Sequence, residues 1–270
     1  MSNQPNNQTE APQSEVSMPE AVTTKAPPIE THRLEIPSSD THINAYLAIP
    51  EGDGPFPAVI VLQEIFGVNT HIRNVTERFA QQGYVAIAPA LYQRLAPGFE
   101  TGYTEEDIEL GREYKQKTDA DELLSDVQGA INYVKSLPNV KPGAIGCIGF
   151  CFGGHVAYLA ATLPDIKATA SFYGAGITTW CPGNDSPTVN RTAQIQGTLH
   201  AFFGVDDQSI PQEQVDQIAG ELQNHSIPHK VFRYPNAGHG FFCDQRGSYS
   251  EKAAKDAWDK VRSLFLETIG

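Results

Sequence analysis

One stretch decides the fold of this chain: residues 143–161, with the sequence GAIGCIGFCFGGHVAYLAA. Its first half is apolar and interrupted only by glycine, which is typical of a buried strand in a parallel sheet. From Val156 onward, apolar residues recur at helical spacing until Pro164. The stretch therefore predicts a strand that turns directly into a helix, with Cys151 at the turn.

The residues around this turn favour a nucleophile. Gly149 and Gly153 stand two positions before and after Cys151, as a sharp strand-to-helix turn requires where backbone passes close by. The turn raises the sulfur above the C-terminal sheet edge, at a helix N-terminus whose dipole favours a thiolate. The N–H of Phe152 then becomes one donor of an oxyanion hole. We interpret the stretch as a nucleophile elbow that carries cysteine.

Two alternative interpretations of the turn have less support. Glycine-rich strand–helix turns also bind phosphate, but this one lacks a Lys-Ser/Thr pair and a GxGxxG spacing. A buried cysteine can also be an inert apolar residue.

Composition limits the classes of protein to consider. A chain of 270 residues, 40% hydrophobic, can bury the core of one large α/β domain. A net charge of −13 argues against nucleic acid or an anionic membrane as a partner. The N-terminus lacks the parts of a signal peptide, and no run resembles a membrane span. We expect a cytoplasmic protein, monomeric rather than oligomeric, that acts on a small molecule.

The four cysteines, at positions 147, 151, 181 and 243, show neither a CxxC pair nor metal-ligand spacing. We expect no disulfide framework, no metal and no cofactor. A bridge between Cys181 and Cys243 stays open.

The order of elements predicts an α/β fold. Residues 1–29 are polar and should form a mobile tail, and residues 30–270 a single domain. An antiparallel hairpin is expected first, at 31–36 and 42–49. Strands and helices then alternate, which indicates a parallel sheet with crossover helices. Further strands are expected at 58–62, 84–89, 144–150, 168–173, 198–204 and 230–234; helices at 72–82, twice within 104–137, after Cys151, at 211–224 and at 249–269; and an irregular loop at 174–196.

A cysteine nucleophile needs a base and an orienting carboxylate, which follow later strands in the order nucleophile, acid, base. Of the eight histidines, His239 fits, because it follows a predicted strand and has glycine on both sides. The acid should follow the strand ending at Gly204. Asp206 and Asp207 both do so, and spacing alone does not choose between them.

With these residues assembled, the chain resembles the dienelactone hydrolase family of the α/β-hydrolase fold. The resemblance covers residues 31 to about 268 and is most specific at 63–69 (QEIFGVN), 149–154 (GFCFGG), 207–211 (DQSIP) and 237–241 (AGHGF). It implies a mostly parallel central sheet with an N-terminal antiparallel hairpin and helices on both faces.

The resemblance also implies roles for individual residues. It selects Asp207 as the acid, and it makes the N–H of Ile65 the second oxyanion donor. Glu64 is implied to lie beside the nucleophile and to take part in its activation when substrate arrives. A carboxylate there opposes ionisation of the thiol and can accept its proton, so the reactive form should appear mainly with ligand bound.

The family's substrate is a lactone with a carboxylate held by arginines, and Arg94 matches one of them in position. The second arginine of the family pattern is replaced by Cys243, and Arg246 is the nearest candidate for its role. We therefore expect a Cys-His-Asp hydrolase acting on a carboxylate-bearing enol-lactone. The alternatives are a broader carboxylesterase or thioesterase of small substrates and a ligand-binding module without turnover. Intact Cys, Asp and His positions argue against the module.

Overall fold

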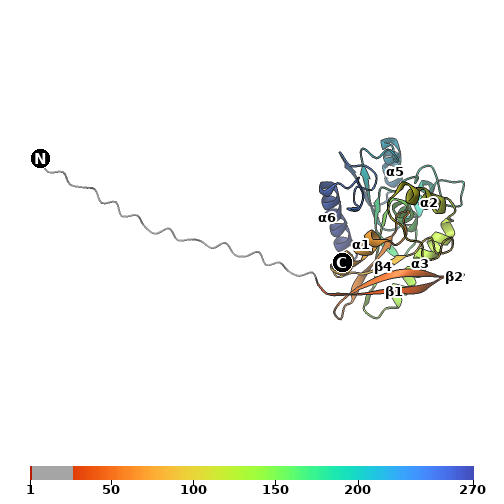
Figure 1. The fold of residues 1–270 in the computed structure, drawn as a ribbon, viewed down its shortest axis with the longest axis vertical. Helices are drawn as coiled ribbons and strands as arrows, with labels where there is room; N and C mark the ends of the chain where they lie inside the picture. The colour runs from red at the N-terminus through yellow and green to blue at the C-terminus, as the bar shows by residue number, and fades with distance from the viewer. Residues whose placement is uncertain (2–26) are drawn as a thin grey trace.

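The structure, a computed structural model, describes Met1 and residues 27–270. The predicted tail lies almost entirely outside these described residues. The first strand begins at Ile29, one residue before the predicted domain boundary. The later elements are arranged around one central sheet (Figure 1).

The described residues form an eight-stranded sheet in the order β1-β2-β4-β3-β5-β6-β7-β8. The hairpin β1–β2 is antiparallel, as predicted, and β2 also pairs antiparallel with β4. All other neighbours are parallel. The strands are β1 (Ile29–Ser38), β2 (Thr41–Pro50), β3 (Phe56–Leu62), β4 (Val85–Pro89), β5 (Val140–Phe150), β6 (Ile166–Phe172), β7 (Thr198–Gly204) and β8 (His229–Tyr234).

Helices cover both faces of the sheet. They are α1 (Thr70–Ala80), α2 (Glu105–Gln116), α3 (Ala120–Ser136), α4 (Phe152–Ala160), α5 (Gln212–Asn224) and α6 (Glu251–Thr268), with a 3-10 helix η1 (Thr188–Gln194). Alternate residues of β3 show the two layers: Val59 and Val61 pack with α1 and α6, whereas Ile60 and Leu62 pack with α3 and α4. Burial on both faces explains why the parallel strands are apolar throughout. The predicted α/β-hydrolase architecture is confirmed.

The strand register places four segments at one edge of the sheet. Leu62 of β3 pairs with Gly149 of β5, so the residues two positions further on, Glu64 and Cys151, leave the sheet side by side. On the other side, Gly204 of β7 pairs with Tyr234 of β8. The loops carrying Asp207 and His239 begin there. All four loops follow C-terminal strand ends, where open α/β sheets form their binding sites.

Some boundaries differ from the expectations. Strand β5 begins at Val140, because Phe56 of β3 pairs with it and extends the ladder past Pro142. Helix α4 ends at Ala160, and the residues up to Leu163 continue as tight turns. The predicted division of 104–137 into two helices is correct, with Asp119 capping α3. The loop 174–196 contains η1.

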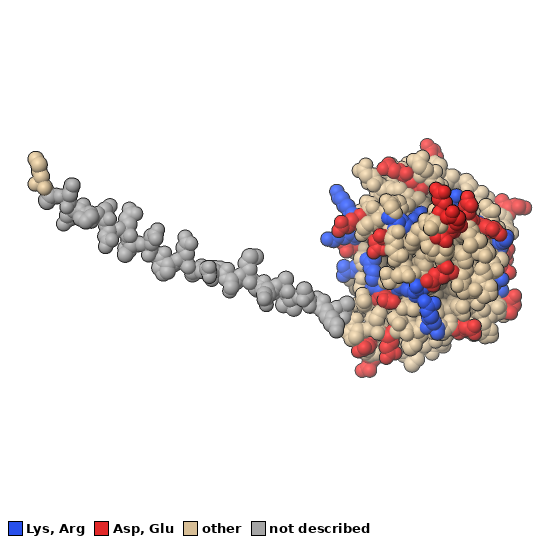
Figure 2. All heavy atoms as spheres, in the orientation of Figure 1, with Lys and Arg blue, Asp and Glu red and all other residues tan. Residues whose placement is uncertain are grey.

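All four cysteines are free, so Cys181 and Cys243 are not bridged. Acidic side chains are spread over the visible face of the folded part, with basic side chains between them (Figure 2). Within the described residues, no helix combines the length and apolarity needed to cross a membrane.

Candidate active site

Cys151 occupies a sharp turn between β5 and α4. Its backbone has φ 54° and ψ −115°, a left-handed conformation that costs energy for any residue with a Cβ. A Cβ on Gly149 would overlap the carbonyl oxygen of Gly153, and a Cβ on Gly153 would overlap the carbonyl oxygens of Leu62 and Gln63. The two glycines therefore allow α4 to start directly against the end of β3. This close approach holds the sulfur above the sheet edge.

The cysteine, the histidine and one aspartate form a continuous chain of contacts. Nε2 of His239 lies 3.1 Å from Sγ of Cys151, and Nδ1 of His239 lies 2.8 Å from Oδ2 of Asp207. Asp207 is buried, and its Oδ1 accepts a 2.8 Å hydrogen bond from the N–H of Ser209. Asp206 is exposed. The structure thus brings Asp207 rather than Asp206 to the imidazole, a choice that spacing left open.

The contacts change the charge of the thiol and the imidazole together. Burial opposes ionisation of Cys151, but the charge and hydrogen bond of His239 outweigh it and lower the thiol pKa. Burial likewise opposes protonation of His239, yet the Cys151 charge and the Asp207 hydrogen bond raise the imidazole pKa. Both shifts favour the thiolate–imidazolium pair, the reactive form of a cysteine nucleophile.

Glu64 lies in the same cluster and is almost completely buried, with its Oε1 accepting a 3.0 Å hydrogen bond from Nη1 of Arg246. Its charge acts to raise the Cys151 pKa, whereas Arg246 acts to lower it. Glu64 thus opposes ionisation of the thiol, as expected, but it does so against two cationic neighbours. In the free protein, His239 and Arg246 already oppose the effect of the carboxylate.

Two backbone N–H groups belong to residues close to Cys151, one next to it in the chain and one that lines the same pocket. Phe152 is the first residue of α4, and Ile65 follows Glu64 in the loop after β3. Within the described residues, neither N–H donates to a protein acceptor. Both donors are therefore available to an oxygen bound beside Cys151.

A pocket of about 280 Å³ opens onto Cys151. Its walls come from the loop after β3, from α2, from Ala175 and from the loops after β7 and β8: Ile65, Phe66, Ile108, Arg112, Lys115, Cys151, Ala175, Ser209, His239 and Arg246. Three of these residues are arginine or lysine. Sequence reasoning found Arg246 but missed Arg112 and Lys115.

Arg112 and Lys115 come from α2, a helix that begins with three acidic residues. Within the part of the chain that the structure describes, neither forms an ion pair. The Lys115 ammonium lies 4.8 Å from the centre of the Trp180 ring, and burial lowers its pKa. A three-residue spacing of basic residues on one helix face was the only available signal.

Arg94 is not brought to the pocket, which corrects its expected place in the site. Its Nη1 donates to Asp40 over 2.6 Å, and its Nη2 donates to Ser38 and to the buried Asp126, each over 3.1 Å. The match of Arg94 to the family pattern could not reveal these contacts, because the two acids that hold its guanidinium come from the turn between β1 and β2 and from α3.

The mostly parallel sheet, the helices on both of its faces and the cysteine turn at its C-terminal edge define a hydrolase-type α/β fold. The model of the Dienelactone hydrolase family matches residues 43–269. The chain therefore belongs to the dienelactone hydrolase family and is a hydrolase of that family.

Individual relatives agree with this assignment. A Synechocystis sp. protein named "Putative carboxymethylenebutenolidase" is 58% identical over 237 residues, covering 88% of this chain and 96% of that protein. A protein of the same name from Escherichia coli K12 is 33% identical over 240 residues, covering 87% of this chain and 86% of that protein. The crystal structure of a "Putative Dienelactone Hydrolase" from Klebsiella pneumoniae is 33% identical, with a TM-score of 0.81 over 89% of this chain and 99% of that one.

Proposed function

We propose that this protein hydrolyses the ester bond of a small enol-lactone that carries a carboxylate, with Cys151 as nucleophile. The observation that carries the proposal is the chain of contacts from Cys151 through His239 to Asp207, at a pocket with three basic side chains. A triad in this arrangement supports acyl transfer.

The first half of the reaction forms a thioester. The Cys151 thiolate attacks the carbonyl carbon, and the N–H groups of Ile65 and Phe152 donate to the oxyanion that forms. When the tetrahedral intermediate collapses, the carbon–oxygen bond of the lactone breaks, and protonated His239 supplies the proton for the departing enol oxygen. An enol leaves more readily than an amine, so an ester or lactone suits this nucleophile better than an amide.

The second half releases the product. His239, now neutral and oriented by Asp207, accepts a proton from water, and the hydroxide attacks the thioester carbonyl. The same two N–H groups stabilise the second oxyanion. Cleavage of the carbon–sulfur bond returns the thiolate and yields an open-chain carboxylic acid.

The charge of the pocket supports a substrate carboxylate. In a chain of net charge −13, an anion is attracted only where basic residues gather. Arg246, Arg112 and Lys115 supply that local charge, and we assign them the role first expected of Arg94. Arg246 is shared with Glu64, which leaves the two α2 residues as the unpaired cations within the pocket.

The test compares a carboxylate-bearing dienelactone with its methyl ester in steady-state hydrolysis. The wild type should prefer the free acid. The substitutions Arg112→Ala and Lys115→Ala should each weaken kcat/KM for the acid by about 10–100-fold, the value of a hydrogen bond to a charged group, and change the ester little. Arg94→Ala is the matched control and should keep the preference.

Two outcomes would contradict the proposal. Turnover retained by Cys151→Ala would exclude the mechanism. Equal hydrolysis of acid and methyl ester by the wild type, unaffected by the α2 substitutions, would instead indicate a broader esterase of small neutral substrates.

A further inference from the structure

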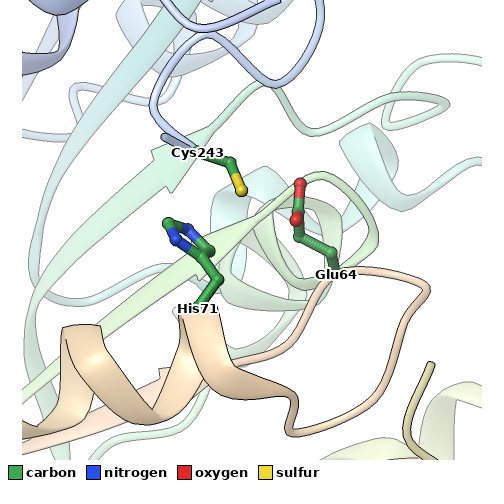
Figure 3. A group of neighbouring side chains, drawn as sticks. All are labelled: Glu64, His71 and Cys243. Atoms are coloured by element: carbon green, nitrogen blue, oxygen red, sulfur yellow. The ribbon is translucent and has the colours of Figure 1, made fainter. Parts of the chain in front are cut away.

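Behind Glu64 lies a group of three side chains that could each donate to a metal. Glu64, His71 and Cys243 are all buried, and one ligand atom of each lies within 4.8 Å of the others. They come from the loop after β3, the first turn of α1 and the loop after β8, and Figure 3 shows them gathered around one space. No sequence spacing links positions 64, 71 and 243, so the sequence predicted no metal site.

Two polar atoms of this group have no hydrogen-bond partner within the described residues. They are Oε2 of Glu64 and Nε2 of His71, and both are buried. An unpaired buried polar atom costs about 1–3 kcal/mol, so such atoms call for an explanation. Arg246 occupies only Oε1 of Glu64, and the second carboxylate oxygen stays available.

We propose that Glu64, His71 and Cys243 form a binding site for a zinc ion. Thiolate, imidazole and carboxylate are the three ligand types that zinc accepts together, whereas magnesium and calcium prefer oxygen alone. Three protein ligands leave the fourth tetrahedral position to water. The ligand charges of Glu64 and the Cys243 thiolate balance the two charges of the ion.

The geometry requires small movements only. Zinc bonds of about 2.0–2.3 Å place neighbouring tetrahedral ligands about 3.5 Å apart. Donor atoms up to 4.8 Å apart must therefore close by at most roughly 1.3 Å. On its other side, Nδ1 of His71 lies 3.9 Å from Oδ1 of Asp244. A carboxylate that accepts a hydrogen bond from the second ring nitrogen is the usual support of a zinc-bound histidine, and the exposed Asp244 would move closer to take that role.

The thiol of Cys243 loses its proton when the sulfur–zinc bond forms, and the proton passes to solvent. Before binding, this thiol donates to the Tyr103 hydroxyl over 3.3 Å, and the same hydroxyl accepts from Asn69 over 3.0 Å. Once the sulfur is ionised, the Tyr103 hydroxyl is free to donate to it. The Tyr103 hydroxyl can thus stabilise a zinc-bound thiolate, whereas burial and the Glu64 charge raise the pKa of the Cys243 thiol in the absence of the ion.

A hollow at the protein surface lies next to His71. His71 and Asp244 line a surface hollow of about 370 Å³ beside α1 and α6, separate from the pocket at Cys151. An ion entering there reaches the imidazole first. Bound zinc would engage the Glu64 carboxylate and so weaken its effect on the Cys151 thiol; this consequence alone rests on the proposed function.

The test measures binding in a protein that cannot turn over. The protein used is metal-free Cys151→Ala, because this variant lacks the other cysteine–histidine pair. It is dialysed against zinc to measure binding. A second sample is dialysed against cobalt, whose bond to a thiolate gives a characteristic absorption. We expect one ion per chain with a micromolar or tighter Kd. In the same background, His71→Gln and Cys243→Ser should weaken binding at least about 100-fold. His42→Gln, at an exposed histidine, and Cys181→Ser, at another buried cysteine, are the matched controls and should bind like the parent.

Circular dichroism and thermal melting establish that each variant is folded, and His71→Gln decides the question if Cys243→Ser does not fold. Absence of one-to-one binding to Cys151→Ala would overturn the proposal. So would binding that is undiminished in a folded His71→Gln variant. Because Cys151→Ala is used throughout, failure of the proposed hydrolysis would leave this result unaffected.

Discussion

Glu64 and Arg246, separated by 182 positions in the chain, meet in a buried 3.0 Å hydrogen bond beside Cys151. The two charges act on the thiol in opposite directions, because the carboxylate raises its pKa and the guanidinium lowers it. Their pairing holds the carboxylate at one oxygen only. The acidity of the Cys151 thiol in the free protein therefore depends on a balance that either residue can shift.

Replacing Glu64 with Gln should make the thiol more acidic. The substitution removes a charge that opposes the thiolate, while His239 and Arg246 continue to favour it. The pH midpoint of Cys151 alkylation by iodoacetamide should therefore move down from its wild-type position. Background labelling is measured in Cys151→Ala. The matched substitution Glu35→Gln, at an exposed glutamate, should leave the midpoint in place, and an upward shift in Glu64→Gln would refute the assigned balance.

Replacing Asp207 with Asn should lower kcat/KM by about 10²–10⁴-fold, the usual contribution of a correctly oriented general base. An asparagine oxygen can still accept a hydrogen bond from Nδ1 of His239, but it lacks the negative charge that stabilises the imidazolium. The adjacent Asp206→Asn is a control one residue away, and it should retain activity because Asp206 is exposed. Equal losses in the two variants would show that the acid is wrongly assigned.

Replacing Gly149 with Ala should destabilise the fold by about 3 kcal/mol, since the new Cβ would overlap the carbonyl oxygen of Gly153 and force backbone to move. Gly220, inside α5, provides the opposite case. A Cβ there meets no atom within 4 Å, so Gly220→Ala should stabilise by about 0.5–1 kcal/mol. Urea denaturation at constant m-value measures both changes in the free energy of unfolding.

Arg94→Ala should reduce stability by about 3 kcal/mol at neutral pH, because it leaves the buried Asp126 carboxylate without its cation. Burial already raises the Asp126 pKa, and Arg94 acts to lower it, so the variant should have a higher pKa still. A folded state that binds a proton more tightly than the unfolded state loses stability as pH rises through the folded pKa. The difference in the free energy of unfolding between the wild type and Arg94→Ala should therefore shrink from neutral pH toward about pH 5.

Urea titrations at the two pH values test this dependence. Arg233→Ala serves as the control, because its partner Asp216 is 66% exposed and exposed pairs contribute little. A deficit in Arg94→Ala that grows on acidification would contradict the role given to Asp126.

Much of the fold could be predicted because its signals are local. The apolar run before Cys151, the glycines around it and the helical spacing after it lie within 19 consecutive residues, 143–161. Each expected strand and helix has a counterpart in the structure, and errors are confined to ends such as the start of β5 at Val140. There, pairing with a neighbouring strand extended the element beyond what its own residues favour.

The sequence by itself determined the architecture, the cysteine at the elbow and the histidine after the last strand, because strand periodicity and turn chemistry depend on neighbouring residues. Only the tertiary structure decided which side chains meet. Strand register set Glu64 beside Cys151, acids from distant elements drew Arg94 away from the pocket, and α2 delivered Arg112 and Lys115 in its place. Such contacts join residues that are far apart in the chain, and they depend on the direction in which each side chain leaves its element.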